Sequence, residues 1–291
     1  TALFVVGLTI KNYPQIITQA RDSTDPRISA IIDSIMPTIH VDGEQQRNFT
    51  YDIKQVYIRY ASIIYHLSSA WRNYQYESHL SQFWDNLYEI ASSLFNIGIN
   101  ADEHLLITNS SEALNQLIFN SSPDVLNKLD WLFDRTLVML DESKTIFSSS
   151  DILYVVQSSL CSNISALLLK LKKSSKGGID IIGNYAQRTL ELLFKLLSNK
   201  HSLIYEEGLM AISALVSATN REQMSIQVFD NETFHRLLTD FVYSGLSSMN
   251  SGVINAACIL IGNLYYFLSG KEPLLSELAQ PIFQTLSSLL I

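Results

Sequence analysis

The sequence contains few residues that interrupt helices and few side chains that carry charge. Its 291 residues include only six prolines, eleven glycines and two cysteines, and only 16% are charged. Two cysteines are too few for a disulfide framework or a structural zinc site. Cys161 and Cys258 each lie in an apolar run, so we expect both to be reduced thiols in the core.

Basic residues are scarce relative to acidic ones, 20 against 28, and the formal net charge is −8. Neutralising phosphates needs a dense Lys/Arg surface, so we expect no nucleic-acid partner. The negative balance instead suits a partner that carries basic residues. A targeting signal or a phosphate site would fit the one basic cluster. We favour a simpler interpretation, because the end of an expected helix is where cations complement the helix dipole. The cluster comprises Lys170, Lys172, Lys173 and Lys176.

Membrane-spanning runs and enzyme motifs are also lacking. The most apolar long stretch, residues 253–268, is shorter than the roughly 20 residues that cross a bilayer, and it contains two asparagines. We therefore expect a buried helix and no membrane insertion. The sequence has no phosphate-binding glycine loop, no zinc-protease motif and no nucleophile elbow, and its six histidines are scattered singly. We expect no catalytic activity, no cofactor and no bound metal ion.

Helical periodicity is what the sequence does contain. Apolar residues recur at i, i+3, i+4 and i+7 along most of the chain, and 47% of residues are hydrophobic. The pattern predicts paired helices over about 26–70, 77–119, 123–173, 179–218 and 226–268, with partial repeats at 1–12 and 271–291. The second helices of the pairs are expected to begin near residues 51, 102, 151, 203 and 251. The first helix of the second pair is expected to stop at Gly98. The first helix of the third pair is expected to start with Ser122 as its cap and Pro123 at its first position, and to end near Leu140.

This spacing of roughly 50 residues is typical of stacked helical repeats. Most of these second helices also carry small residues before aliphatic ones, as in Ala211-Ile-Ser-Ala-Leu, which allows neighbouring helices to pack closely. We therefore predict an all-α protein, an α–α superhelix of about six hairpins. It would have one continuous core over residues 1–291 rather than two globular domains. An irregular helical bundle is the alternative, but it requires no fixed period. Because the chain begins and ends inside expected helices, we interpret it as a piece of a longer protein.

Five segments, taken in order, resemble the importin beta family of nuclear transport receptors, which are built of HEAT repeats. Each match is weak alone, and the resemblance depends on their order over about six repeats. The segments are residues 1–7, 110–117, 160–170, 206–215 and 253–264.

The resemblance implies that the concave face of the solenoid binds an importin-alpha adaptor or a basic cargo, chiefly through second helices. The implied binding residues are Phe4 and Tyr65, which stand at family tryptophan positions, and the acids Glu206 and Glu207. Seven residues after each tryptophan the family often has an acid. Here those positions hold Lys11 and Arg72, which weakens the implied basic grip in the first third of the chain.

Further partners and a location follow from the same resemblance. It implies release of the adaptor by Ran-GTP in the full-length receptor, mainly through earlier repeats, and residence in the cytoplasm, nucleus and nuclear pore. Weak contacts with phenylalanine-glycine nucleoporins between adjacent first helices are also implied. For any single groove between first helices, however, we expect ordinary packing between repeats. The alternative function is a HEAT scaffold of an enzyme assembly such as a protein phosphatase. Its repeats of about 40 residues are shorter than those here.

Overall fold

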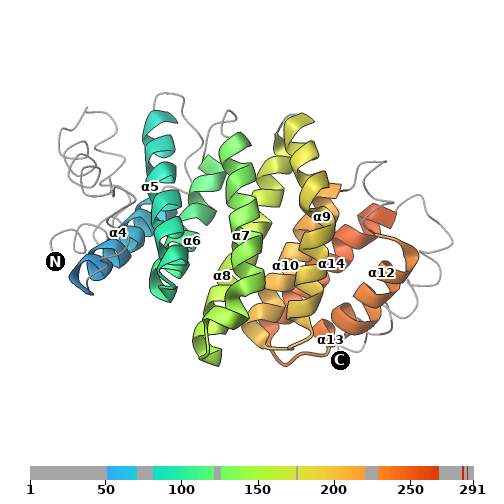
Figure 1. Cartoon of the computed structure of the whole chain (residues 1–291). Helices are drawn as coiled ribbons and strands as arrows, with labels where there is room; N and C mark the ends of the chain where they lie inside the picture. Colours follow the sequence, from blue (N-terminus) through green and yellow to red (C-terminus); the bar gives the residue numbers. More distant parts are fainter. Residues whose placement is uncertain are drawn as a thin grey trace. The chain divides into compact units, whose positions relative to one another are not determined.

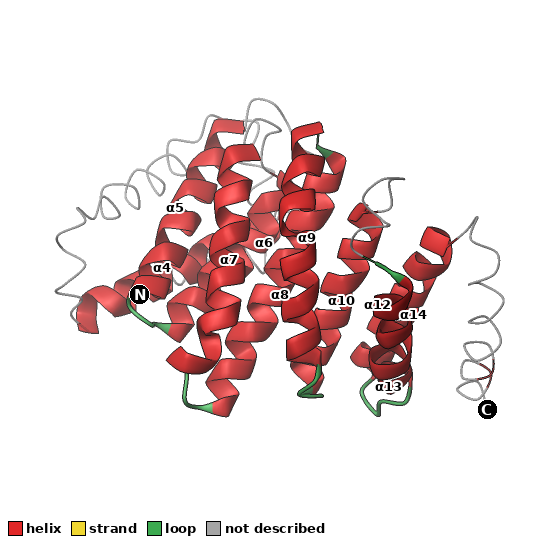
Figure 2. Cartoon of the chain, turned by 45° about the vertical axis from the view of Figure 1, so that its right-hand side comes forward, coloured by secondary structure: helices red, strands yellow, loops and turns green. Residues whose placement is uncertain are grey.

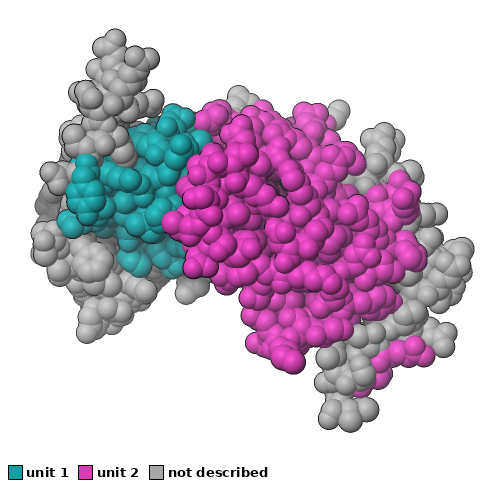
Figure 3. All heavy atoms as spheres, turned by 60° about the horizontal axis from the view of Figure 1, so that its bottom comes forward, with its two compact units in different colours: residues 1–125 teal, residues 126–291 magenta. Residues whose placement is uncertain are grey.

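The described part of the protein is a set of helices joined by short turns. The computed structural model describes residues 51–70, 81–120, 126–174, 176–219 and 229–268, together with residues 284 and 287. Helices are drawn throughout these ranges and no strand occurs in them (Figure 2). The chain divides into two compact units, residues 1–125 and 126–291 (Figure 3), and each is described by itself. The single core predicted for residues 1–291 stays a prediction.

Unit 1 contains three described helices, α4 (Tyr51–Ala70), α5 (Ser81–Asn100) and α6 (His104–Asn120). Helices α5 and α6 form a hairpin, and α4 packs against α6. The turn of the hairpin places Asp102 at a φ of 50°, the left-handed conformation that tightens a chain reversal. A Cβ on Gly98 would lie 3.0 Å from the backbone nitrogen of Ile107. We expected α5 to stop at Gly98, but there the glycine serves close packing and the helix continues to Asn100.

The described part of unit 2 contains three hairpins, whose helices Figure 1 shows in two layers. Helices α8 (Ser150–Lys173), α10 (Ser202–Thr219) and α14 (Ser251–Leu268) form the second-helix layer, with α10 packed between α8 and α14. Helices α7 (Leu126–Ile146) and α9 (Lys176–Leu197) pack together in the first-helix layer. The partner of α14 is a broken helix of three pieces, α12 (Asn231–Arg236), the π-helical turn η5 (Leu237–Val242) and α13 (Tyr243–Leu246).

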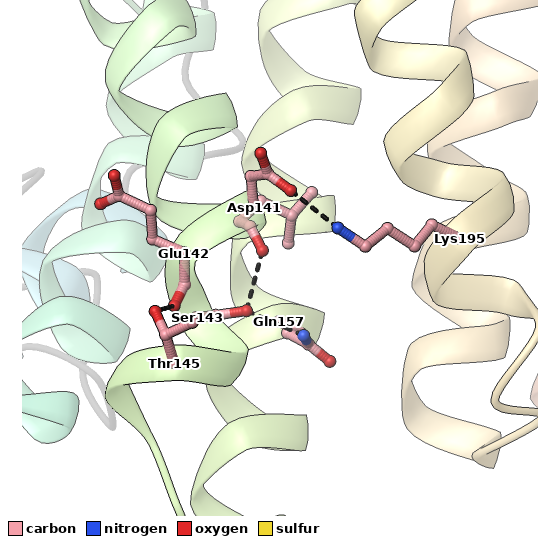
Figure 4. Close-up of polar contacts among 7 residues, drawn as sticks. Asp141, Glu142, Ser143, Thr145, Gln157 and Lys195 are labelled. Atoms are coloured by element: carbon pink, nitrogen blue, oxygen red, sulfur yellow. Dashed lines mark hydrogen bonds and ion pairs between the residues drawn. The ribbon is translucent and has the colours of Figure 1, made fainter.

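The predicted repeat period is confirmed. The second helices begin at residues 51, 104, 150, 202 and 251, each within two residues of its expected start. In the first-helix layer Asp134 pairs with Arg188 at 3.3 Å, an offset of 54 residues. The same offset recurs two turns later, where Asp141 pairs with Lys195 at 2.9 Å (Figure 4). The constant offset shows that α7 and α9 run alongside each other in a single register. The all-α solenoid predicted from the sequence is therefore the observed fold class.

Two features of unit 2 differ from prediction. Helix α7 was expected to end near Leu140, but it continues to Ile146 because its last turns are covered by α8. There the buried hydroxyl of Ser143 accepts a hydrogen bond of 2.8 Å from Nε2 of Gln157 (Figure 4). Cys161 is buried as expected, but Cys258 is exposed, because it lies on a side of α14 that packs against neither α10 nor α13. Of the other expectations, the helix cap at Ser122 and Pro123 and the helices before residue 51 lie outside the described residues. So does the helix over about 274–290, apart from residues 284 and 287, which are helical.

Among the described helices, α8 is long and apolar enough to cross a membrane by length and composition. Its most apolar window is 56% buried within the protein, where it packs against α7, α9 and α10. The contacts are those of a core helix.

Candidate partner-binding surface

Helix α10 presents one narrow outward stripe because both of its flanks are covered. Its neighbours α8 and α14 pack on either side, and α9 packs beneath it. Twelve of its residues are buried, so only one side of the helix is accessible. That side carries Leu203, Glu206, Glu207, Met210 and Ser217, which recur at helical spacing. Two adjacent carboxylates therefore stand on the accessible side of the central second helix.

Glu207 is directed toward α8, where its carboxylate forms a hydrogen bond with the side chain of Ser162. Burial raises the pKa of Glu207 above its ordinary value, and the charge of Glu206 raises it further. The Ser162 hydrogen bond opposes both effects without cancelling them. Solvent therefore stabilises the negative charge of Glu207 less than that of an ordinary surface glutamate, and a nearby cation would stabilise it.

Glu206 is directed the other way, toward the start of α14. A Cβ on Gly252 would collide with the Glu206 carboxylate, so the carboxylate lies directly against the backbone of the first turn of α14. That turn is capped by Asn250, whose Oδ1 accepts a hydrogen bond of 2.8 Å from the Gly252 amide. A carboxylate near a helix N-terminus is favoured by the positive end of the helix dipole. The two neighbouring glutamates thus occupy the two seams that flank α10.

Neither glutamate has a cationic partner in the described part of the chain. The ion pairs found there join Lys54 to Glu103, and link Asp134, Asp141 and Asp240 to basic residues, but none reaches α10. Two half-buried carboxylates on adjacent residues, with no basic partner among the described residues, make this surface attractive to an external Lys or Arg. The pair of glutamates can bind a cationic side chain. It contains no nucleophile beside a base.

A basic group lies on the same layer, ten residues further along α8. Lys172 donates a hydrogen bond of 2.7 Å from Nζ to Oγ of Ser217 on α10. It belongs to the cluster predicted at a helix end, and Lys170, Lys172 and Lys173 do occupy the last turn of α8. Lys176 begins α9 instead. The layer therefore carries charges of both signs.

The predicted aromatic residue Tyr65 lies on α4 in unit 1 and is half-buried. It follows Lys54 by eleven residues, or three helical turns, and so shares its side of the helix. Lys54 forms an ion pair with the buried carboxylate of Glu103 at the start of α6, which identifies this side as the one that borders α6. Tyr65 is not among the buried core residues of α4, such as Ala61 and Ile64. Phe4, Lys11 and Arg72 lie outside the described residues.

Glu112 is an acidic residue on a second helix that the sequence analysis did not select. It is half-buried on the outward stripe of α6, between the exposed side chains of Leu105 and Phe119. Burial raises the pKa of its carboxyl group. The sequence could have indicated Glu112, because it is a glutamate in mid-helix directly before Ala113 and Leu114, which are buried. Glu112 resembles Glu207 in burial and in the direction of its pKa shift.

The first-helix layer shows the packing expected of a repeat interface. Ion pairs from Asp134 to Arg188 and from Asp141 to Lys195 cross from α7 to α9. The exposed Trp131 is the large apolar side chain of α7 on this layer. Within the described ranges, no group of three or more His, Cys, Asp or Glu residues is arranged to hold a metal ion.

Comparison with known protein families gives one match over most of the chain. Residues 60–288 match the family described as importin subunit beta-1-like, TPR repeats. TPR and HEAT repeats are both helical hairpins, and the spacing of about 50 residues observed here is longer than the 34 residues of a TPR unit. Comparisons with curated proteins and with solved structures gave no match.

Proposed function

Because the chain belongs to the importin subunit beta-1-like repeat family, we propose that it serves in a nuclear import receptor as a binding element. The family is typically non-catalytic. The ligand we propose is an importin-alpha adaptor or a basic cargo, held on the accessible side of the second helices. Glu206 and Glu207 would bind its cationic side chains, and Phe4 and Tyr65 would pack against their aliphatic stems.

The single observation that carries this proposal is the pair of half-buried carboxylates on α10. Glu207 is partly desolvated, and the negative charge of its immediate neighbour Glu206 disfavours the ionised form of Glu207. An arriving Lys or Arg relieves this repulsion and gains charge-assisted hydrogen bonds, each worth roughly 1.5–3 kcal/mol. The net charge of −8 adds long-range attraction for a basic segment.

The experiment neutralises the pair without changing its shape. In the variant Glu206→Gln/Glu207→Gln, the affinity for an importin-alpha adaptor, measured by fluorescence anisotropy, should fall at least about tenfold, or roughly 1.4 kcal/mol. The matched control is Glu142→Gln/Glu191→Gln, which removes two exposed carboxylates from the first-helix layer and should change affinity less than about twofold. Equal losses in both variants would mean that only net charge matters, and would overturn the site.

The remaining parts of the proposal concern the full-length receptor. Ran-GTP would release the adaptor mainly through repeats outside residues 1–291, and weak contacts with phenylalanine-glycine nucleoporins would lie between first helices. The protein would then shuttle between cytoplasm and nucleus through the nuclear pore. A pull-down of the full-length receptor with adaptor, with and without Ran-GTP, tests this part. Adaptor that stays bound in the presence of Ran-GTP would contradict it.

A further inference from the structure

The seam between α8 and α10 holds a negative and a positive group at a fixed separation. Ser162 on α8 forms a hydrogen bond with Glu207 on α10, and Lys172 on α8 donates one to Ser217 on α10. The members of both pairs are 45 positions apart, so the two contacts lie ten residues from each other along both helices. At about 1.5 Å per residue, that separation is about 15 Å.

Each charged side chain is held in place by a serine from the opposite helix. The Lys172 Nζ to Ser217 Oγ distance is 2.7 Å, and Ser217 is itself half-buried. Such a contact reduces the number of positions that the lysine samples, which lowers the entropy that a partner must remove on binding. Glu207 is held in the same way by Ser162. The seam therefore presents two preorganised charges of opposite sign.

The residues between the two charges along the seam are uncharged. They are Ser165 and Leu169 on α8 and Met210 and Ala214 on α10, of which Ala214 is buried and the others are half-buried. Small and aliphatic residues at this position allow another helix to approach closely. These uncharged residues contribute apolar contact, and the charges at the two ends of the seam determine which segment fits.

We propose that the α8–α10 seam binds a helical segment of the partner protein that carries basic residues at one end and acidic residues about ten positions away. The basic end contacts Glu207, and the acidic end contacts Lys172 and its exposed neighbour Lys173. A helix is the form that fits, because ten helical residues span about 15 Å, whereas an extended chain covers the same distance in about five. This inference rests on the proposed function and adds the charge order and spacing of the ligand.

The test uses four synthetic helical peptides that share one block of lysines and arginines. Ten residues beyond the block, the first carries two glutamates, the second two glutamines and the third two lysines. The fourth carries its two glutamates only five residues beyond the block. Affinity of the whole chain for each is measured by fluorescence anisotropy at low salt. The ten-residue glutamate peptide should bind about threefold to tenfold more tightly than the glutamine peptide, the gain expected of two exposed ion pairs.

The wild-type chain should prefer the peptide with two distal glutamates to the one with two distal lysines, and reversing the charge at Lys172 should reverse this preference. In Lys172→Glu, the peptide with two distal lysines should bind more tightly than the one with two distal glutamates. The control Lys144→Glu reverses a charge in the last turn of α7, so it has a similar effect on a helix dipole. It should retain the wild-type preference. This comparison separates recognition at the seam from changes in net charge or helix stability.

Each other outcome has a distinct meaning. If the ten-residue glutamate and glutamine peptides bind equally well while Glu206→Gln/Glu207→Gln still weakens both, the inference is wrong and the proposed function stands. If the five-residue peptide gains the affinity instead, the bound segment is extended and the helical register is wrong. If no peptide depends on Glu206 and Glu207, the proposed function fails together with the inference.

Discussion

Replacing Tyr205 by Phe tests the contact between α10 and the π-helical turn η5 in unit 2. Tyr205 lies in the first turn of α10 and is 4% exposed. Its hydroxyl donates a hydrogen bond of 2.9 Å to the carbonyl oxygen of Phe241, inside η5, and forms a second one with Ser244. Tyr205→Phe removes only the hydroxyl and keeps the buried ring. The variant therefore isolates the polar contact from the packing.

The expected loss follows from these two contacts. A buried hydrogen bond contributes about 1 kcal/mol net, so the free energy of unfolding should fall by about 1–2 kcal/mol. Urea titration should show a lower midpoint with an unchanged slope, because the buried surface is the same. For a unit of this size the melting temperature should drop by about 2–8 °C. Tyr265→Phe is the control, because that tyrosine is 63% exposed on α14 and should leave the midpoint unchanged.

Alkaline pH provides a second measurement on the same residue. Burial is the main cause that raises the pKa of Tyr205 from 10.0 to about 12. The unfolded chain therefore loses the phenolic proton first, and the wild type loses stability as pH rises from 10 toward 12. The stability gap between wild type and Tyr205→Phe should narrow over that range. A gap that is absent at neutral pH, or that does not change at high pH, would refute the role of this hydroxyl.

Two further predictions concern the candidate surface. Tyr65→Ala should weaken adaptor binding about twofold to fivefold, the loss expected when an exposed aromatic–cation contact is removed. A large drop in melting temperature with unchanged affinity would instead make Tyr65 a core residue. Glu207→Gln should stabilise the chain at neutral pH, because the carboxyl has a raised pKa in the folded state and its ionisation there disfavours folding. This advantage should vanish as pH falls below the ordinary glutamate pKa, and an advantage that persists in acid would contradict the assigned cause.

The fold was predictable where apolar periodicity and small residues determine the structure. The starts of the second helices follow from the apolar pattern, and the bounds predicted for Tyr51–Ala70 and Ser251–Leu268 agree with the structure. The end of α7 was missed because Asp141-Glu-Ser-Lys-Thr has the composition of a surface loop. Ser143 within it is buried only because Gln157 reaches it from the next helix. Such a contact depends on tertiary packing, which local composition does not report.

The candidate site was predictable only in part. Resemblance singled out Glu206 and Glu207, but adjacent residues on one helix gave no indication that one is directed to Gly252 and the other to Ser162. Those directions depend on the register of α8 and α14 beside α10. The role of Lys172 in the α8–α10 seam was missed for the same reason. From the sequence, the helix dipole alone accounts for lysines at a helix end. Only the structure shows that Lys172 donates a hydrogen bond to Ser217 on α10.

We propose that the second-helix layer of unit 2 faces the bound partner. The direct measurement is photo-cross-linking of the chain to an importin-alpha adaptor, with a photoreactive phenylalanine analogue at Met210 in one variant and at Trp131 in another. Met210 lies beside Glu206 and Glu207 on α10, and Trp131 is exposed on α7 in the other layer. We expect a cross-link from position 210 that free basic peptide competes away, and none from position 131. A competed cross-link from position 131 with none from position 210 would contradict it.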